Sequence, residues 1–511
     1  MNWEQVKIKP ILVLFLFSFL LIIFFIIGFF LFQQKVLIVG DGFEFTTIQS
    51  AVDQSEPGDI ILVTDSLSPY AEPVEIMNKT GISIIGIGKP VLDGSTLPAG
   101  SNGISISNSS RIRVKGLTIQ EYIFDGFGGG NGIIVENSSD LNLFVKNKLI
   151  SNGEFGFFAF ESSRNLVLSN KTNQNLDGIR IDLSEKDIVI GNESNDNEVF
   201  GILISSPNSL TLGNVMERND TGIDAQDQEI FIANKIIDST GEDVFEVDGS
   251  ENILIGNKVI RTIDEDGIKI DGDFNILIGN VAIENGETGL IIDDDTQNNI
   301  VIGNRLLNNG EDGLLVDEDT LDHLVMNNKM IGNQRNGIRI ADRTFNIMFK
   351  RNVVKENTIG IFLRNDLETF DQEIKIINNK IIGNIEEGIL FGGAIANTIN
   401  HNTIHRNGIG IRFTEDEDGT LAQENVISHN SITKNEGDGI MFEESLNNTI
   451  EKNHILSNGA VGLFLDVDST GNQVLNNRAF FNFILDIQDD DNNIFQGNKC
   501  GTSFGPVDCP N

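Results

Sequence analysis

Aspartates recur at fixed distances from short apolar segments in the middle of the chain. Two sets of three lie four and six residues beyond a glycine that opens such a segment: Asp271, Asp293 and Asp317, then Asp273, Asp295 and Asp319. If the segments stack as strands about 4.8 Å apart, the carboxylates crowd one another, which raises their pKa values or calls for cations between them. Calcium binds six to eight oxygen ligands in loose geometry. These six aspartates are therefore candidate ligands of a calcium site.

Two other interpretations of the same aspartates stay open. Aspartate is favoured at turns, so the six side chains could be solvated corner residues of a very acidic protein. Two carboxylates about 5–10 Å apart could instead perform glycoside chemistry. The choice depends on the elements that position them.

A repeat of asparagines indicates what those elements are. Asn257, Asn280, Asn304, Asn328 and Asn352 follow one another at steps of 23, 24, 24 and 24 residues. Each is followed by a glycine that opens a short apolar segment, as in GIKI, GLII, GLLV and GIRI. The series extends in both directions through Asn147, Asn170, Asn192, Asn214, Asn234, Asn379, Asn402, Asn430, Asn453, Asn476 and Asn498.

A period of this size fits a leucine-rich repeat or a β-helix. Here the apolar runs are short and rich in isoleucine, and Asn, Asp and Gly separate them, which favours short strands joined by sharp corners. Ile268 and Ile270 are expected to point inward and Lys269 outward. Stacked asparagines are expected to form hydrogen-bonded ladders. The sequence therefore predicts an all-β, single-stranded right-handed parallel β-helix over residues 38–499.

The two ends of the β-helix carry features that would cover exposed strand edges. Residues 47–53 place Ile48, Ala51 and Val52 on one helical face, which predicts an N-terminal capping helix before a first strand at residues 59–63. Cys500 and Cys509 are the two cysteines, and they are expected to close a C-terminal disulfide loop over residues 500–511.

Residues 11–32 are an apolar run of 22 residues without a charge, long enough to span a bilayer as a helix. A cleaved signal peptide would have a shorter apolar core and a small-residue cleavage site. We therefore expect one uncleaved transmembrane anchor. Lys7 and Lys9 precede it, which assigns residues 1–10 to a cytoplasmic tail. The β-helix is then expected to be extracytoplasmic on a single-pass membrane protein.

The charge of the chain excludes one class of partner. Lys+Arg 36 against Asp+Glu 75 gives a formal net charge of −39, and such a surface repels phosphate backbones, so no nucleic acid is expected as a partner. The same field opposes polyanionic glycans unless cations bridge the two surfaces. Neutral glycans remain possible partners.

The opening FTTIQSAVDQSEPGDIILV, then PVEI, TGISIIGIGKPVLDG and the GI-x-I repeats resemble right-handed parallel β-helix proteins of the pectin-lyase-like superfamily. The branch is the one that NosD-like proteins share with carbohydrate-binding and sugar-hydrolysing β-helix domains. The resemblance implies that the protein binds, and as a second option processes, polysaccharide at the cell surface. If it is an enzyme, the implied classes are polysaccharide lyase, glycoside hydrolase and epimerase. The polygalacturonase-like N-T-D, D-D and R-I-K set and the D-P-H-D motif of alginate epimerases are missing, so catalytic residues stay unknown and a non-catalytic scaffold or adhesin is the alternative.

Two further features bear on where a ligand would bind. The repeat is lengthened after the GI strand at residues 364–371 and 415–420, and insertions in a solenoid often mark its binding side. Neutral drift in a tolerant corner is the alternative. His401 and His429 precede a repeat asparagine in neighbouring coils and could stack, and the NosD-like resemblance suggests copper there. Other coils place Gly, Asn, Arg or Lys at the same position, so an outward site that tolerates many residues is the alternative.

Overall fold

The computed structural model describes residues 35–241, 244–365, 372–490, 493–507 and 509. The predicted cytoplasmic tail at residues 1–10 and the predicted anchor at residues 11–32 lie outside this range. Within the described ranges, no helix is both long enough and apolar enough to cross a bilayer. The described chain is almost entirely short parallel strands, with one helix, and it divides into two units, Met1–Phe245 and Glu246–Asn511.

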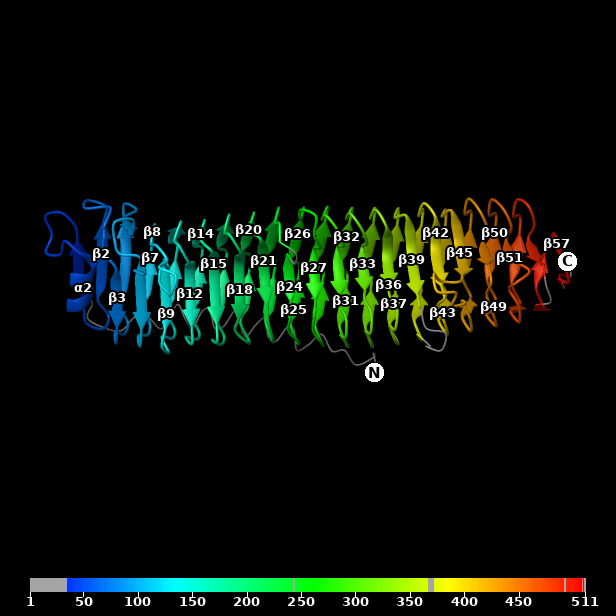
Figure 1. Cartoon of the computed structure of the whole chain (residues 1–511), viewed down its shortest axis with the longest axis horizontal. Helices are drawn as coiled ribbons and strands as arrows, with labels where there is room; N and C mark the ends of the chain where they lie inside the picture. The colour runs from blue at the N-terminus through cyan, green and yellow to red at the C-terminus, as the bar shows by residue number, and fades with distance from the viewer. Residues whose placement is uncertain (1–34, 242–243, 366–371, 491–492, 508, 510–511) are drawn as a thin grey trace. The chain divides into compact units, whose positions relative to one another are not determined.

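The N-terminal unit begins with its cap (Figure 1). Helix α2 (Ile48–Gln54) starts at Thr47, whose side chain accepts a hydrogen bond from the Ser50 N–H, and it buries Ile48, Ala51 and Val52 as predicted. One strand precedes the expected first strand, because β1 (Val36–Val39) pairs in parallel with β2 (Ile60–Thr64). The solenoid therefore begins two residues earlier than the sequence predicted.

The N-terminal unit contains three parallel sheets, which we call A, B and C, and each coil adds one strand to each sheet. Sheet A holds β1, β2, β4 (Ser83–Ile87), β7 (Arg113–Lys115), β10 (Leu143–Val145), β13 (Leu166–Leu168), β16 (Ile188–Ile190), β19 (Leu210–Leu212) and β22 (Ile230–Ile232). Sheet B holds β5 (Val91–Asp93), β8 (Thr118–Gln120), β11 (Lys148–Ile150), β14 (Lys171–Asn173), β17 (Glu193–Asn195), β20 (Val215–Glu217) and β23 (Lys235–Ile237). Sheet C holds β3 (Val74–Met77), β6 (Ile104–Ser107), β9 (Ile133–Glu136), β12 (Phe155–Phe160), β15 (Asp177–Asp182), β18 (Phe200–Ser205) and β21 (Thr221–Ala225).

The C-terminal unit repeats the same three-sheet coil. Its sheet A holds β25 (Ile253–Ile255), β28 (Ile276–Ile278), β31 (Ile300–Ile302), β34 (Leu324–Met326), β37 (Met348–Lys350), β40 (Lys375–Ile377), β43 (Thr398–Asn400), β46 (Val426–Ser428), β49 (Thr449–Glu451), β52 (Gln473–Leu475) and β55 (Ile494–Gln496). Its sheet B holds β26 (Lys258–Ile260), β29 (Val281–Ile283), β32 (Arg305–Leu307), β35 (Lys329–Ile331), β38 (Val353–Lys355), β41 (Lys380–Ile382), β44 (Thr403–His405), β47 (Ser431–Thr433), β50 (His454–Leu456), β53 (Arg478–Phe480) and β56 (Lys499–Cys500). Its sheet C holds β24 (Phe245–Val247), β27 (Ile268–Ile270), β30 (Leu290–Ile292), β33 (Leu314–Val316), β36 (Asn336–Ile340), β39 (Ile359–Arg364), β42 (Glu387–Gly392), β45 (Ile409–Thr414), β48 (Ile440–Phe442), β51 (Leu463–Leu465), β54 (Ile487–Asp489) and β57 (Ser503–Phe504).

The core of the coil follows the predicted alternation of side chains. Ile268 and Ile270 are buried, whereas Lys269 between them points outward and keeps part of its surface in water. In β27 and β30 the registered pairs are Ile268 with Leu290 and Ile270 with Ile292, so like residues stack from coil to coil. This confirms the strand register.

The predicted asparagine ladder is present and satisfies its own polar groups. Asn280 donates its backbone N–H to Oδ1 of Asn304 over 2.7 Å, and its Nδ2 donates to the carbonyl oxygen of Leu254 over 3.0 Å. One member was assigned wrongly, because Asn477 and not Asn476 accepts from Asn453 over 2.9 Å. Asn476 is exposed at the preceding corner with φ 56°.

Two more ladders run at other corners, and one explains the strand-opening glycines. Asn285 donates its N–H to Oδ1 of Asn309 over 3.2 Å, five residues beyond the first ladder, and Asn275 donates to Asn299 over 2.8 Å, five residues before it. A Cβ atom on Gly289 would lie 2.5 Å from Nδ2 of Asn309. These glycines therefore leave room for a ladder amide, whereas glycines such as Gly303 (φ 69°) serve the left-handed corners.

At the C-terminal end, Cys500 and Cys509 are drawn as a pair with their Cα atoms 5.5 Å apart. A disulfide spans that separation. The bond itself stays a prediction for an oxidising compartment.

Candidate functional site

The predicted calcium ligands do not all lie together. Asp293, Asp317 and the neighbouring Asp294 place carboxylate oxygens within 4.8 Å of one another at the corners that follow β30 and β33. We call these three residues the acidic triad. Asp294 was not among the predicted ligands, because its side chain comes from a position between the two that were counted.

The other predicted ligands are placed differently. Asp273 accepts hydrogen bonds from the backbone N–H and the side-chain amide of Gln297, over 2.9 and 3.0 Å. Asp319 pairs with Arg343 over 2.9 Å. Asp271 and Asp295 are exposed, and Asp295 has φ 58°, so it serves the corner.

The electrostatics of the acidic triad suit a cation. Burial raises the pKa of Asp317, and the charge of Asp293 adds to the rise. Burial and the charges of Asp317 and Asp293 likewise raise the pKa of Asp294. Lys269 offsets part of this charge through its Nζ, 3.1 Å from Asp293 Oδ2. Three side chains supply fewer oxygens than calcium takes, so water or ligand oxygens would complete the shell.

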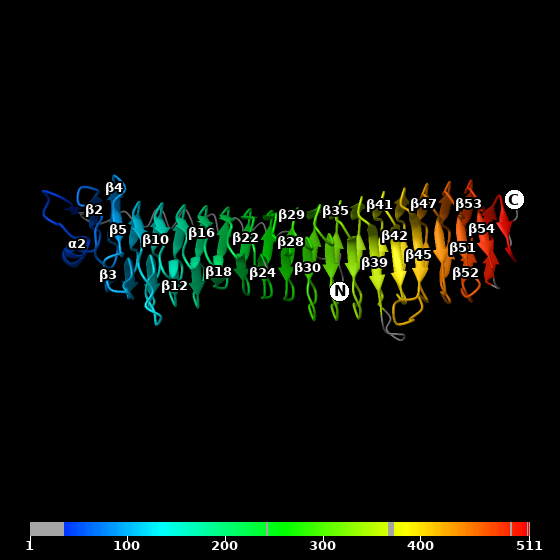
Figure 2. The same ribbon diagram turned by 45° about the horizontal axis from the view of Figure 1, so that its top comes forward.

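A groove of about 500 Å³ lies on the outer face of sheet C in the C-terminal unit, over β36, β39, β42 and β45. Figure 2 shows the loop after β45 projecting from the edge of these coils. The residues that line the groove are Arg335, Asn336, Arg339, Phe362, Arg364, Leu390, Gly392, Thr414, Glu415, Asp416 and Glu417. We call it the sheet C groove.

The sheet C groove combines apolar and charged walls. Phe362 and Leu390 are half-buried neighbours in register on β39 and β42. Arg335 pairs with Glu311 over 2.9 Å, and Arg364 contacts Asp342 over 3.4 Å. Arg339 forms no ion pair with any residue that the structure describes.

The predicted insertion at residues 415–420 forms part of this groove. Asp416 Oδ1 accepts the backbone N–H groups of Asp418 and Thr420, over 2.9 and 2.8 Å, which fixes the loop. The first insertion, at residues 364–371, lies outside the described range from residue 366 onward. Sequence reasoning missed Phe362 and Leu390, although both occupy the outward position of a GI strand, where Lys269 had already been recognised.

Packed aromatic rings lie beneath the groove. Directly beneath the outward residues, Phe391, Phe413 and Phe442 are buried and stacked, with ring centroids 4.3 Å apart in each successive pair. Arg412, on the outer face, is held between Glu387 and Glu443 over 3.2 and 2.8 Å. Packed strands with neutralised neighbours hold the lining side chains in place.

A family model described as "Right handed beta helix region" matches residues 71–211, 102–242, 225–371 and 360–504. These matches span most of the chain. The chain is a right-handed β-helix protein. No functionally curated protein matches it.

Several solved β-helices resemble this one. An alginate lyase from Paenibacillus sp. str. FPU-7 matches with 14% identity and a TM-score of 0.38, over 48% of this chain and 94% of its own. A mannuronic acid specific polysaccharide family 6 lyase from human gut microbiota gives 11% and 0.37, over 71% and 87%. A mannuronan C-5 epimerase A-module of Azotobacter vinelandii gives 12% and 0.25, over 89% and 94%.

The N-terminal unit of the β-helix has a smaller groove of about 320 Å³ on its own sheet C, lined by Phe160, Arg180, Asp182, Leu183, Leu203, Ser205, Asp224 and Gln226. Arg180 is neutralised there by Asp177 and Asp182, over 3.2 and 2.8 Å. Its guanidinium also lies 5.3 Å from the centre of the Phe155 ring. This groove therefore offers acids and amides more than free cationic charge.

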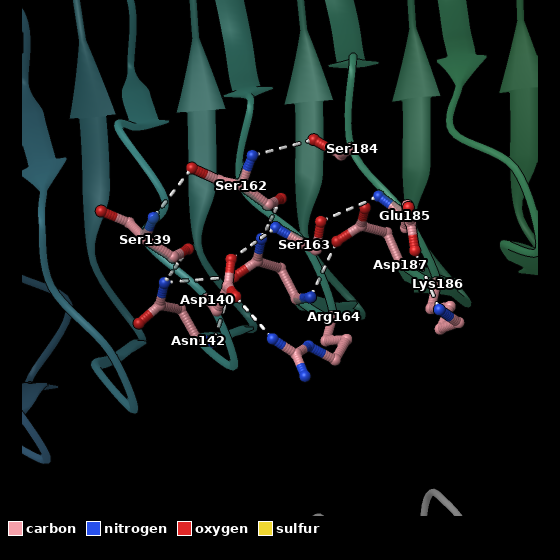
Figure 3. Close-up of polar contacts among 11 residues, drawn as sticks. Ser139, Asp140, Asn142, Ser162, Ser163, Arg164, Ser184, Glu185, Lys186 and Asp187 are labelled. Carbon is pink, nitrogen blue, oxygen red and sulfur yellow. Dashed lines mark hydrogen bonds and ion pairs between the residues drawn. The ribbon is translucent and has the colours of Figure 1, made fainter.

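Figure 3 shows a polar corner of the same unit that has a structural explanation. Ser139 and Ser162 each donate a backbone N–H to the hydroxyl of the serine in the next coil, over 3.1 Å. Arg164 pairs with Asp140 over 2.6 Å. Burial raises the pKa of Asp187 to about 7, but its carboxylate accepts from Asn165 and Ser206. The polar groups of this corner therefore satisfy one another's hydrogen bonds.

The predicted histidine pair does stack. The rings of His401 and His429 lie 4.9 Å apart and within 4° of parallel, and both side chains are exposed at a corner with positive φ. Copper binding at this pair stays a prediction.

Proposed function

We propose that this β-helix binds a polysaccharide in the sheet C groove. The observation that carries the proposal is the groove itself, an open site of about 500 Å³ that places an aromatic ring, aliphatic surface and charged groups side by side over packed strands. Ligand sites combine apolar walls with a few placed polar groups in this way.

The two kinds of wall suit the two kinds of surface on a sugar. The C–H faces of a pyranose ring can pack on Phe362 and Leu390, while hydroxyl groups bond to the guanidinium and carboxylate groups around them. Arg339 forms no ion pair in the described chain, although its charge acts on Asp312 and Asp317, so its guanidinium can donate hydrogen bonds to a hydroxyl or acidic substituent of the glycan. We propose binding as the role, and we assign no catalytic residue.

The acidic triad belongs to the proposal as a calcium site. Support comes from the convergence of Asp293, Asp294 and Asp317 and from the raised pKa values of Asp294 and Asp317. A bound calcium would stabilise these coils and, through open coordination positions, could also accept sugar oxygens.

The place of action belongs to the proposal as well. The apolar run at residues 11–32 supports a single-pass anchor with the β-helix on the extracytoplasmic side. The partner would then be a glycan at the cell surface.

A glycan array probed with the full-length chain tests the proposal. We expect binding to a restricted set of polysaccharides, and we expect Phe362→Ala with Arg339→Ala to lose it. If the parent chain binds no glycan on the array, the non-catalytic scaffold becomes the better account of this regular solenoid.

A further inference from the structure

The outer face of sheet B in the C-terminal unit carries a line of cations. The first residue of each strand from β26 to β56 points outward and stacks on the first residue of the next strand. In chain order these eleven residues are Lys258, Val281, Arg305, Lys329, Val353, Lys380, Thr403, Ser431, His454, Arg478 and Lys499. Six are lysine or arginine and none is acidic, in a chain with a net charge of −39.

These cations are available to a partner. All six are exposed, and none forms an ion pair with any residue in the described ranges. By contrast, Arg343 is neutralised by Asp319 and Arg412 by Glu443. The corner after the strands holds the acids Glu284 and Glu356, and Glu356 already pairs with Lys355. That corner also holds Arg406 and Lys434.

An apolar column runs beside the line of cations. The third residues of the same strands also point outward, are half-buried and are mostly aliphatic: Ile260, Ile283, Leu307, Ile331, Ile382 and Leu456, with Phe480 near the end. Ten steps of about 4.8 Å extend the line of cations over roughly 50 Å, and the apolar column is one step shorter because β56 has no third residue. The face thus presents a straight cationic edge and a parallel apolar edge.

We propose that this face, the sheet B face, binds a linear acidic polysaccharide lying along the coil axis. An acidic sugar chain has the matching amphipathic character, with carboxylate or sulfate groups for the cations and C–H ring faces for the aliphatic column. A single-stranded nucleic acid would need aromatic side chains on which bases stack, and the column is aliphatic. A lipid surface is a plane, whereas these cations form a single line.

The overall negative charge does not prevent such binding. Salt screens charges beyond about 8 Å at physiological ionic strength, and the apolar core separates this face from the acidic corners after sheet C. From the net charge alone, polyanionic glycans are expected to be opposed unless cations bridge the two surfaces, because only the register shows that cations gather on one sheet. This site is independent of the sheet C groove and does not rest on the function proposed above.

Fluorescence anisotropy of a labelled polyuronate with the full-length chain, in the presence of a calcium chelator, tests the proposal. Arg305→Gln with Lys329→Gln and Lys380→Gln should weaken binding roughly tenfold at low salt, since each exposed charge contributes modestly. The control triple Arg164→Gln, Lys186→Gln and Arg218→Gln changes net charge equally but removes cations that have acidic partners. It should leave the affinity unchanged.

A second set of variants separates binding at the sheet B face from binding in the sheet C groove. Built into a Phe362→Ala background, the sheet B triple should still give its tenfold loss. An equal affinity of parent and sheet B triple in both backgrounds overturns the proposal. Equal binding of a single-stranded oligonucleotide or of anionic vesicles, lost in the same triple, overturns the choice of an acidic polysaccharide.

Discussion

His323 should make the C-terminal unit sensitive to acid. Its imidazole occupies a ladder position, where Nδ1 accepts the backbone N–H of Asn299 over 3.1 Å. In the two preceding coils the same position holds Asn299 and Asn275, joined over 2.8 Å. Nε2 of His323 is buried and has no partner in the described chain. His323→Asn restores the repeated residue and removes the only titratable group of this run of the ladder.

The size of the effect follows from the burial of the ring. Burial lowers the pKa of His323 from 6.5 to about 4, and the charges of Asp322 and Asp273 offset only part of that shift. Between these pH values His323 is protonated in the unfolded chain but neutral in the folded chain, so the free energy of unfolding falls as pH falls. At 1.36 kcal/mol for each pKa unit, the loss reaches about 3 kcal/mol at pH 4.

Urea unfolding of parent and His323→Asn across pH 4–7 measures this loss. The difference between the two proteins cancels the titration of carboxylates that both share. We expect the variant to gain about 3 kcal/mol on the parent between pH 7 and pH 4. His401→Asn, at an exposed ring, is the control. A difference that stays constant with pH would refute the assignment of a buried neutral imidazole.

Four further outcomes are expected. Ile270→Asp should lower stability by several kcal/mol because it buries an unpaired charge, whereas Lys269→Gln on the outer face should cost less than about 1 kcal/mol; equal urea midpoints would contradict the strand register. Asn477→Ala should cost about 1–3 kcal/mol for its buried partners, while Asn476→Gly should be nearly neutral at its left-handed corner, and the reverse order would restore the original ladder assignment. Calcium should raise the melting temperature, by about 2.7 kcal/mol of stability at a hundredfold excess over the dissociation constant, and magnesium should do so poorly; an unchanged calcium response in Asp293→Asn with Asp317→Asn would remove the acidic triad as the site. Sequencing the mature N-terminus should find residues 11–32 retained, and a start near Gln33 or Lys35 would show a cleaved signal peptide instead.

Much of the fold could be predicted because its cause is local and repeated. The step between Asn280 and Asn304 and the alternation around Lys269 fix the period, the strands and the inward side chains. The ladder slipped by one residue at Asn476 because two adjacent asparagines fit the step almost equally well. Only the hydrogen bond from Asn453 distinguishes the buried amide from the corner residue.

The candidate sites were harder to predict because they depend on register between coils. Counting residues from each strand-opening glycine grouped Asp273 with Asp293. In the structure, Gln297 donates a hydrogen bond to the carboxylate of Asp273. The acidic triad contains Asp294 instead. Phe362 and Arg339 come from neighbouring strands, and their common groove appears only when the coils stack. Net charge, for the same reason, gave no sign of the cationic line.

The affinity of the full-length chain for its best glycan, compared between Phe362→Ala and Phe464→Ala, tests the central claim most directly. Both residues are half-buried phenylalanines on the outer face of sheet C, but only Phe362 lines the groove. We predict that Phe362→Ala weakens binding roughly fivefold, since one stacked ring contributes about 1 kcal/mol, and that Phe464→Ala leaves the affinity unchanged. Equal affinities of the two variants would contradict binding in the sheet C groove.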